Sequence, residues 1–213
     1  MKFDSFKKSI PKIKNLDLPG REAQLKMAPA LRREELEAIA SKSLNPKRAA
    51  VMCLFYPNEH NETFFILILR KTYKGVHSNQ VGFPGGKVED KDIDLQHTAL
   101  RETEEEIGIS TDNIQVYKQC SNIYIPPSNF TVLPFIGVLN ETPIFTPQES
   151  EVEAILEVAL SDFLSDENVI TKTLETSYAQ QIKVPAFLLN DQVVWGATAM
   201  MLSEIKQLLK EIL

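Results

Sequence analysis

Cysteine is scarce in this sequence, and its scarcity limits how the fold can be held together. The 213 residues include two cysteines, Cys53 and Cys120, and both fall within apolar stretches that are typical of strands. Paired cysteines staple small secreted domains, whereas isolated ones in apolar stretches are typical of buried thiols in a reducing compartment. We therefore expect two free thiols rather than a disulfide.

Long apolar runs and secretion signals are also missing. No apolar run approaches the roughly 20 residues that a membrane-spanning helix needs. Residues 1–16 are basic and amphipathic, but they carry Asp4 early and lack the hydrophobic region of a secretory signal. These features predict a cytoplasmic protein with no membrane partner, in which the N-terminal segment is a helix or arm of the domain.

Positive charge is in deficit, with 23 Lys and Arg residues against 29 Asp and Glu and a net charge of -6. An acidic chain is poorly suited to bind nucleic acid, although a local basic pocket for a small anion is compatible with a net negative charge. The length suits one domain with a full core. We expect no nucleic-acid partner, a partly helical lead-in at residues 1–46, and the main part of the same domain at residues 47–213.

The pattern of apolar residues predicts a mixed α+β order in which helices cover a sheet. Residues 48–57 and 63–71 are almost continuously apolar, which is typical of strands covered on both faces, and the polar segment between them favours a hairpin. Residues 72–86 are expected to form a loop. Helical segments are expected at 31–44, 95–107 (with Gly108 as a left-handed cap) and 196–213, and further strands at 113–125, 130–139, 152–160, 169–174 and 182–189.

Four carboxylates crowd the last turn of the helix expected at 95–107, namely Glu102, Glu104, Glu105 and Glu106. Like charges at this spacing repel one another, and the negative end of the helix dipole disfavours them further. A helical wheel places Glu106 inside the apolar arc and Glu102 at its border, whereas Glu104 and Arg101 fall on the solvent side. An acidic run is usually a solvated face, but an unpaired carboxylate against the core is costly. A hard divalent cation resolves that conflict, so we favour a metal site.

A Pro-Gly-Gly turn lies upstream of this helix, within the segment FPGG (Phe83–Gly86). Proline fixes one turn, and the two glycines are free of Cβ constraints. Taken alone, such a segment is typical of an ordinary strand-to-helix turn. Together with the glutamates downstream, it favours backbone groups that approach a ligand or a metal closely.

These residues resemble the Nudix box, GX5EX7REUXEEXGU, in which U is aliphatic. The segment RETEEEIGI (Arg101–Ile109) matches the second half, with Thr103 at the first U position. Between Gly86 and Arg101 the chain has one residue more than the box, and Asp92 stands about where the box has its first glutamate. The extra residue and FPGG resemble the coenzyme A pyrophosphatase branch of the Nudix hydrolases, as do residues 70–86, 146–164 and 193–202.

The resemblance implies a fold, a cofactor and a set of site residues. The fold would be an α/β/α sandwich around a mixed β-sheet, with the box forming a loop–helix–loop catalytic motif. Mg2+ or Mn2+ would be bound by Glu102, Glu105 and Glu106, with the carbonyl of Gly86 also in reach. Glu105 is implied either as a third ligand or as the residue that helps to deprotonate water, and Arg101 as the residue that orients a glutamate.

The implied activity is metal-dependent hydrolysis of the diphosphate bond of coenzyme A or acyl-coenzyme A, which yields 3',5'-ADP and (acyl-)4'-phosphopantetheine. Two alternatives stay open. One is a Nudix diphosphatase that acts on ADP-ribose, a dinucleotide or a nucleoside triphosphate, and the other is a Nudix domain that binds a nucleotide without hydrolysing it. The expected partner is therefore a small nucleotide, and both a monomer and a homodimer are compatible with the sequence.

Candidate substrate-binding residues lie on both sides of the glycines: Arg70, Lys71, Lys74, His77, Gly85 and Lys87. Arg70 ends an apolar strand and suits bidentate pairing with phosphate, whereas the lysines at 71 and 74 fit a solvated loop equally well. A distant carboxylate is expected to complete the metal sphere or to act as general base. Glu149 and Glu151 are the alternatives for that role.

Overall fold

The two long apolar runs form neighbouring antiparallel strands, β1 (Lys47–Pro57) and β2 (Thr63–Arg70), at the centre of the main sheet. The computed structural model describes residues 1–29, 45–71, 80–176 and 179–213. The helix expected at 31–44 and the candidates Lys74 and His77 lie outside the described residues. The hairpin predicted between the first two strands is confirmed, since Pro57 pairs with Thr63.

The main sheet is mixed because one of its pairs is parallel. Strand β1 runs parallel to β7 (Phe130–Val138), and every other pair between described strands of this sheet is antiparallel. The remaining strands of this sheet are β3 (Val81–Gly82) and β8 (Val152–Ala159) beside β2, β4 (Gly85–Lys87) beside β1, and β5 (Gln115–Gln119) and β6 (Ile123–Ile125) beside β7. The short helix η2 (Thr111–Asn113) lies between α4 (Leu95–Ile107) and β5, and η3 (Pro126–Ser128) lies between β6 and β7.

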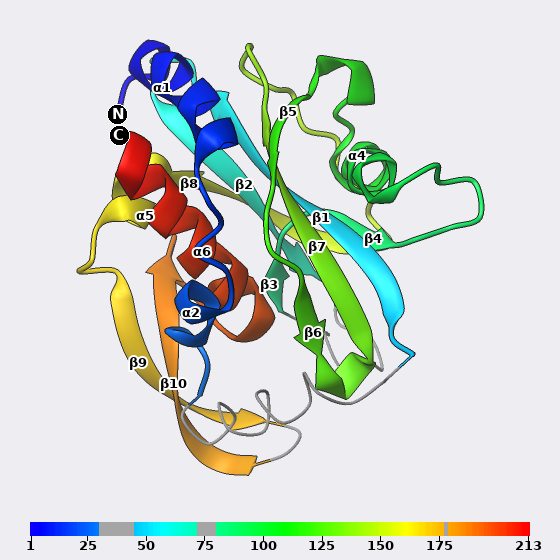
Figure 1. Ribbon diagram of the computed structural model, residues 1–213, viewed down its shortest axis with the longest axis vertical. Helices are drawn as coiled ribbons and strands as arrows, with labels where there is room; N and C mark the ends of the chain where they lie inside the picture. Colours follow the sequence, from blue (N-terminus) through cyan, green and yellow to red (C-terminus); the bar gives the residue numbers. More distant parts are fainter. Residues whose placement is uncertain (30–44, 72–79, 177–178) are drawn as a thin grey trace.

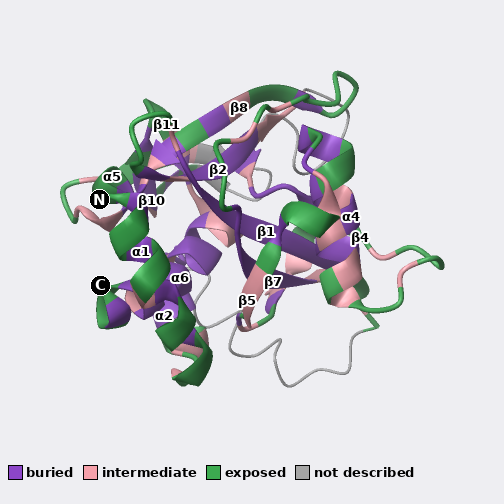
Figure 2. Ribbon diagram, turned by 90° about the horizontal axis from the view of Figure 1, so that it is seen from above, coloured by how far each residue is buried: buried purple, intermediate pink, exposed green. Residues whose placement is uncertain are grey.

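Both faces of the sheet are covered by helices, which explains why β1 is apolar almost throughout (Figure 1, Figure 2). Alternate side chains of a strand point to opposite faces. Cys53 and Phe55 join the cluster that contains residues of α6 (Gly196–Ile212), whereas Met52 and Leu54 join the cluster that contains residues of α4 (Leu95–Ile107). This arrangement confirms the predicted α+β class, with helical layers on either side of a mixed sheet.

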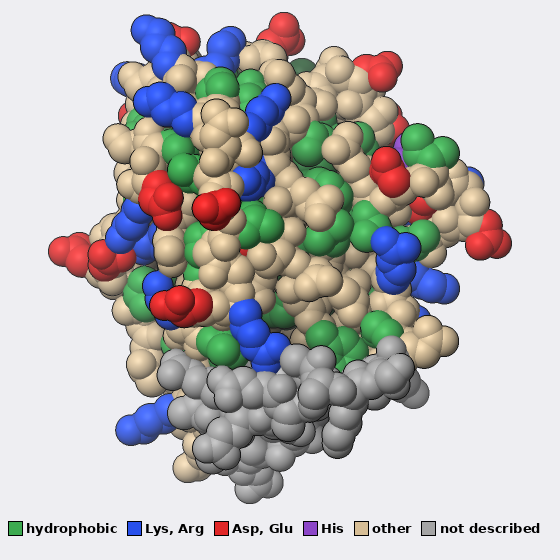
Figure 3. Space-filling view, in the orientation of Figure 1, with side chains coloured by type: hydrophobic (Ala, Val, Ile, Leu, Met, Phe, Trp, Pro, Cys, Tyr) green, Lys and Arg blue, Asp and Glu red, His purple; other side chains and the backbone are tan. Residues whose placement is uncertain are grey.

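The N-terminal segment packs on the α6 side of the sheet. It forms α1 (Phe3–Ser9), η1 (Ile10–Asn15) and α2 (Gly20–Leu25), and its apolar residues Phe3, Phe6, Ile10 and Ile13 are buried in the same cluster as α6. Lysines of α1 and η1 face solvent instead, and basic side chains gather over this region in Figure 3. The amphipathic pattern of the segment is therefore satisfied by the core of this chain. The domain boundary at residue 46 stays a prediction.

Two features of the fold differ from the sequence-based expectation. Residues within the loop expected at 72–86 form β3, which pairs with β2, and β4, in which Gly85 allows the chain to lie closely against β1. In addition, β9 (Val169–Thr176), β10 (Ala179–Leu189) and β11 (Gln192–Val194) form a separate antiparallel sheet that follows α5 (Leu160–Leu164). Local periodicity predicts strands but not which strands pair.

The thiols of Cys53 and Cys120 are free and buried, as expected. In the described part of the chain, no helix combines the length and apolar character that crossing a membrane requires.

Candidate active site

Helix α4 begins and ends where its capping residues predict. The side chain of Asp94 accepts a hydrogen bond from the backbone N–H of His97 at 2.7 Å, and Gly108 ends the helix with a φ of 74°. The backbone N–H groups of Thr146 and Gln148 donate to the carbonyl oxygens of Ile107 and Glu106 at 2.9 and 3.0 Å. The segment that carries Glu149 and Glu151 is thereby anchored to the glutamate-rich end of the helix.

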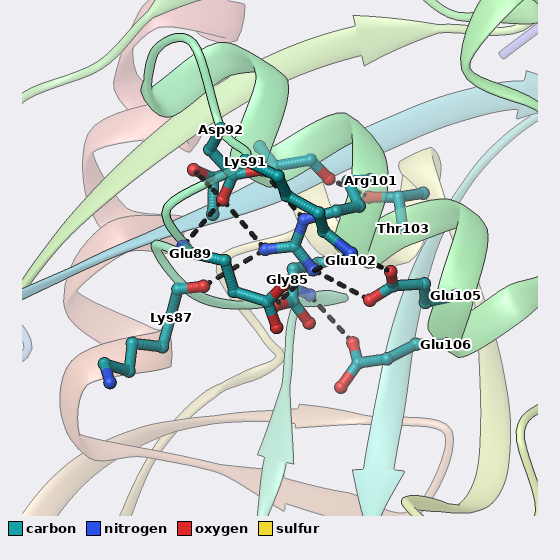
Figure 4. A network of polar contacts seen from close by, with 12 residues as sticks. Gly85, Lys87, Glu89, Lys91, Asp92, Arg101, Glu102, Thr103, Glu105 and Glu106 are labelled. Atoms are coloured by element: carbon teal, nitrogen blue, oxygen red, sulfur yellow. Dashed lines mark hydrogen bonds and ion pairs between the residues drawn. The ribbon is translucent and has the colours of Figure 1, made fainter.

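Arg101 is buried beneath the loop that precedes α4, so the wheel-based expectation of a solvent-facing side chain is wrong. Its guanidinium uses all five N–H donors (Figure 4). Nε and Nη2 donate to the two oxygens of Asp92 at 2.8 and 2.9 Å, and Nη2 also donates to the carbonyl of Lys87 at 3.1 Å. Nη1 donates to Glu102 at 2.9 Å and to Glu105 at 2.8 Å. A single side chain therefore positions two of the candidate metal ligands.

Asp92 is the counter-charge that makes this arrangement possible, and it was absent from the expected site residues. Its side chain is 0% exposed, and it accepts further hydrogen bonds from the hydroxyl of Thr98 and the backbone N–H of Glu89. The Arg101 guanidinium, with these neutral donors, holds the pKa of Asp92 well below its usual range. The sequence feature that could have identified Asp92 as a site residue was its position, because Asp92 stands about where the Nudix box has a glutamate.

Glu106 is the most deeply buried carboxylate of the site, at 1% exposure. Its Oε2 accepts a hydrogen bond of 2.8 Å from the backbone N–H of Gly85, and its Oε1 lies 3.3 Å from Nη1 of Arg70. That ion pair lacks hydrogen-bond geometry, so Oε1 is a buried oxygen with no hydrogen-bond partner. Burial raises the pKa of Glu106 to about 7 against the opposing effects of Arg70 and the Gly85 amide, and the charges of Glu102 and Glu151 raise it further.

Glu102 lies against the backbone of Gly86, which explains why a glycine stands there. A Cβ added to Gly86 would meet the carboxylate carbon and Oε2 of Glu102 at 2.4 Å. Burial is the main cause that raises the pKa of Glu102, and the negative charges of Glu105 and Glu151 add to it, whereas Arg101 lowers it. The neighbouring Glu105 is 44% exposed. The helical wheel predicted Glu106 in the core and Glu102 at its border, and the structure has Glu106 buried and Glu102 half-buried.

The other candidates divide by their distance from these glutamates. Glu151 is exposed, yet it lies close enough for its charge to raise the pKa of both Glu102 and Glu106. Glu149 is also exposed, and its charge is not among the main causes that raise either pKa. The backbone N–H of Lys71 donates to the carbonyl of Glu151 at 2.9 Å, which places the end of β2 beside this acid.

Arg70 and Lys87 lie at the edges of the same site. Nη2 of Arg70 donates to the carbonyl of Gly85 at 2.7 Å, and the side chain of Arg70 is 26% exposed. The side chain of Lys87 is exposed, and its carbonyl accepts from Arg101. Gly85 itself has a φ of 145°, and a Cβ there would meet the carbonyl oxygen of Ala50 at 2.4 Å. Arg70 and Gly85 therefore contact the Glu106 carboxylate, whereas Lys87 joins the site through its backbone carbonyl and its side chain points away from Glu105 and Glu106 (Figure 4).

The donor set suits a hard divalent cation. Glu102 and Glu106 have pKa values that burial and neighbouring carboxylates raise, and one oxygen of Glu106 has no hydrogen bond, so both side chains gain from a cation that takes oxygen ligands. The carboxylates are oriented mainly toward arginines, and no group of three His, Cys, Asp or Glu side chains among the described residues is arranged to hold an ion. Rotation of these carboxylates toward a shared ion would be required.

Comparison with known protein families identifies the family that the motif Arg101–Ile109 suggested. The NUDIX domain family matches residues 46–175. The chain belongs to the Nudix family. The fold agrees with this assignment: the match to a Nudix hydrolase from M. smegmatis, RenU, covers 79% of this chain and 88% of that chain, with a TM-score of 0.55 at 13% sequence identity.

Nudix relatives of this chain include coenzyme A diphosphatases, which confirms the resemblance to that branch. The mitochondrial coenzyme A diphosphatase of Homo sapiens is 33% identical over 138 residues, which cover 63% of this chain and 58% of that protein. The peroxisomal coenzyme A diphosphatase of Caenorhabditis elegans is 29% identical over 171 residues, which cover 78% and 70%. Chloroplastic Nudix hydrolase 22 of Arabidopsis thaliana is 32% identical over 173 residues, which cover 78% and 56%.

The chain spans little more than half the length of the Arabidopsis relatives that it matches. These relatives carry names that refer to mitochondria, peroxisomes and chloroplasts. The expectation of a cytoplasmic protein stays a prediction.

Proposed function

We propose that this Nudix protein hydrolyses the diphosphate bond of coenzyme A or acyl-coenzyme A, with Mg2+ or Mn2+ as cofactor, to give 3',5'-ADP and (acyl-)4'-phosphopantetheine. Two relatives named coenzyme A diphosphatases support the substrate. The observation that carries the chemistry is the buried Glu106 carboxylate, which has one oxygen without a hydrogen bond and lies near Glu102. A buried carboxylate is costly to keep in a protein core, and the contact with Arg70 leaves Oε1 of Glu106 without the hydrogen bond that would offset this cost, so a divalent cation that coordinates this oxygen would stabilise it.

The cofactor would be held by the side chains of Glu102, Glu105 and Glu106, with the carbonyl of Gly86 as a further oxygen. When bound, Mg2+ or Mn2+ neutralises charge on the diphosphate and lowers the pKa of the attacking water.

The protein's own residues orient the metal-binding carboxylates and accept the proton of the attacking water. Arg101 fixes the directions of Glu102 and Glu105 through its Nη1 atom, and Asp92 fixes Arg101 in turn. A carboxylate oxygen of either Glu105 or Glu151 accepts the proton of the attacking water, because both are partly exposed beside the buried glutamates.

The substrate would be bound by cationic side chains at the open edge of the site. Lys71 and Lys87 bind phosphate oxygens as point charges, and Arg70 does so with its forked guanidinium. Lys74 and His77 are proposed as further substrate-binding residues.

Turnover of a substrate panel tests the proposal. Purified protein is incubated with Mg2+ or Mn2+ and with coenzyme A, acetyl-coenzyme A, ADP-ribose, NADH or nucleoside triphosphates, and the products are separated by chromatography. Preferred release of 3',5'-ADP supports the proposal. Exclusive turnover of another compound transfers the chemistry to that substrate, and tight binding without turnover of any compound rejects catalysis.

A matched pair of variants tests the role of the buried carboxylate. Glu106→Gln removes the charge and keeps the shape, so we expect turnover to fall about 1,000-fold, the scale expected when charge stabilisation at the reacting group is lost. Glu104→Gln is the control, because Glu104 lies on the same helix but is exposed. We expect the control to stay within about twofold of the unmodified rate, since surface substitutions away from a site have small effects. Unmodified turnover by Glu106→Gln would exclude Glu106 as a ligand.

A further inference from the structure

Arg70 contacts the site in a way that differs from a residue reserved for substrate. Its guanidinium bridges two protein oxygens: Nη2 donates to the Gly85 carbonyl at 2.7 Å, and Nη1 lies 3.3 Å from Oε1 of Glu106. The N–H of Gly85 donates to the other oxygen of Glu106 at 2.8 Å. Arg70, Gly85 and Glu106 therefore form a closed ring of polar contacts at the end of β2.

The two side-chain contacts that Arg70 makes with described residues are unequal in quality. The bond to the carbonyl is short, whereas the contact with Oε1 of Glu106 lacks the geometry of a hydrogen bond and leaves that oxygen without a partner. Arg70 is also 26% exposed, in contrast to the buried Arg101. A partly exposed side chain with one loose contact can move away from Glu106 at less cost than one whose five donors are all used.

We propose that Arg70 and the divalent cation compete for Oε1 of Glu106, and that the displaced guanidinium binds the diphosphate of the substrate. This inference rests on the proposed metal site. A cation of charge two beside Glu106 repels a guanidinium 3.3 Å from the same oxygen, and the planar fork of arginine matches two phosphate oxygens. Ion binding is thereby coupled to the formation of the phosphate-binding surface, and Arg70 is a positioning residue for Glu106 until it contacts the substrate.

Calorimetric titration with Mn2+ alone, in the absence of substrate, tests the competition. Arg70→Gln removes the competing charge, so we expect its Kd for Mn2+ to be lower than that of the unmodified protein by about threefold or more. Arg70→Lys keeps the charge and should stay close to the unmodified value. Lys172→Gln, on the exposed surface of β9, makes the same change in net charge away from the site and should also leave Kd unchanged.

Steady-state kinetics supply the second part of the test. We expect Arg70→Gln to raise KM for the diphosphate substrate about tenfold or more at saturating Mn2+, because a contact with the bound phosphates is lost. Equal or weaker Mn2+ binding by Arg70→Gln would overturn the competition. An unmodified protein that binds no Mn2+ would instead overturn the proposed function, so the two failures are distinguishable.

A measurement on the unmodified chain covers the case in which Arg70→Gln does not fold. Mg2+ is titrated into 15N-labelled protein while the Nε–H signal of Arg70 and the backbone amide of Gly85 are followed by NMR. Displacement predicts that both signals move as the ion binds. Unmoved signals at saturating Mg2+ would contradict the proposal.

Discussion

Replacing Asp92 by asparagine tests whether the loop before α4 holds the site together. The substitution keeps the shape of the side chain, but one of its two acceptor oxygens becomes a donor. Both oxygens of Asp92 accept from Arg101, at 2.8 and 2.9 Å, so either orientation of the amide leaves one arginine N–H without its acceptor. The side chain of Asp92 is 0% exposed, and water does not replace the lost bond.

The expected loss in the free energy of unfolding follows from removing one charge of a buried ion pair. Such a loss typically costs 3–5 kcal/mol, and we expect about 3 kcal/mol because Arg101 keeps Glu102, Glu105 and the Lys87 carbonyl as acceptors. For a chain of this length, that cost lowers Tm by roughly 6–12 °C. Turnover should fall as well, by about tenfold, since Arg101 orients two of the glutamates.

Thermal denaturation of Asp92→Asn beside Asp90→Asn measures this effect. Asp90 lies in the same loop and is exposed, so its substitution should shift Tm by about 2 °C at most. Equal Tm values for the two variants would refute the reasoning that Asp92 anchors Arg101.

The pH dependence of the same difference supplies an independent check. The pKa of Asp92 is depressed in the folded protein, so its stabilising effect is fully present above the unfolded value of about 4. The effect is lost as the pH falls further toward the folded pKa. The difference in the free energy of unfolding between the unmodified protein and Asp92→Asn should therefore narrow between about pH 5 and pH 3.

Two further predictions concern the same site. Gly86→Ala places a Cβ 2.4 Å from the Glu102 carboxylate and should lower turnover about tenfold, whereas Tm should fall by only a few degrees because the end of the Glu102 side chain can move. Gly82→Ala is the control, since its Cβ meets its neighbours at 3.8 Å, and equal turnover rates of the two variants would contradict the close packing of Gly86 against Glu102. Glu151→Gln should lower turnover by about 100-fold and Glu149→Gln by less than about twofold, as measured by initial rates, since Glu151 and not Glu149 is among the main causes that raise the pKa values of Glu102 and Glu106. The reverse order would assign the distal role to Glu149.

Most of the scaffold around the site could be predicted from local sequence patterns. The helix at 95–107 has the bounds expected from its periodicity and from Gly108, and the continuously apolar residues 48–57 form a strand covered on both faces. These features depend on neighbours a few residues apart along the chain. Strand pairing beyond the hairpin of β1 and β2 joins residues that are distant in the sequence, so local patterns did not predict it, and the separate sheet of β9, β10 and β11 was not expected.

The sequence by itself determined that acidic side chains would meet an apolar core near Glu106, because the helical period alone assigns that residue to the buried arc. Only the tertiary structure decided the partners of those acids. The loop that carries Asp92 folds over the helix and buries Arg101, and β2 brings Arg70 to Oε1 of Glu106. A helical wheel contains one helix and no neighbours, so it cannot place a charge that is buried by another segment of the chain.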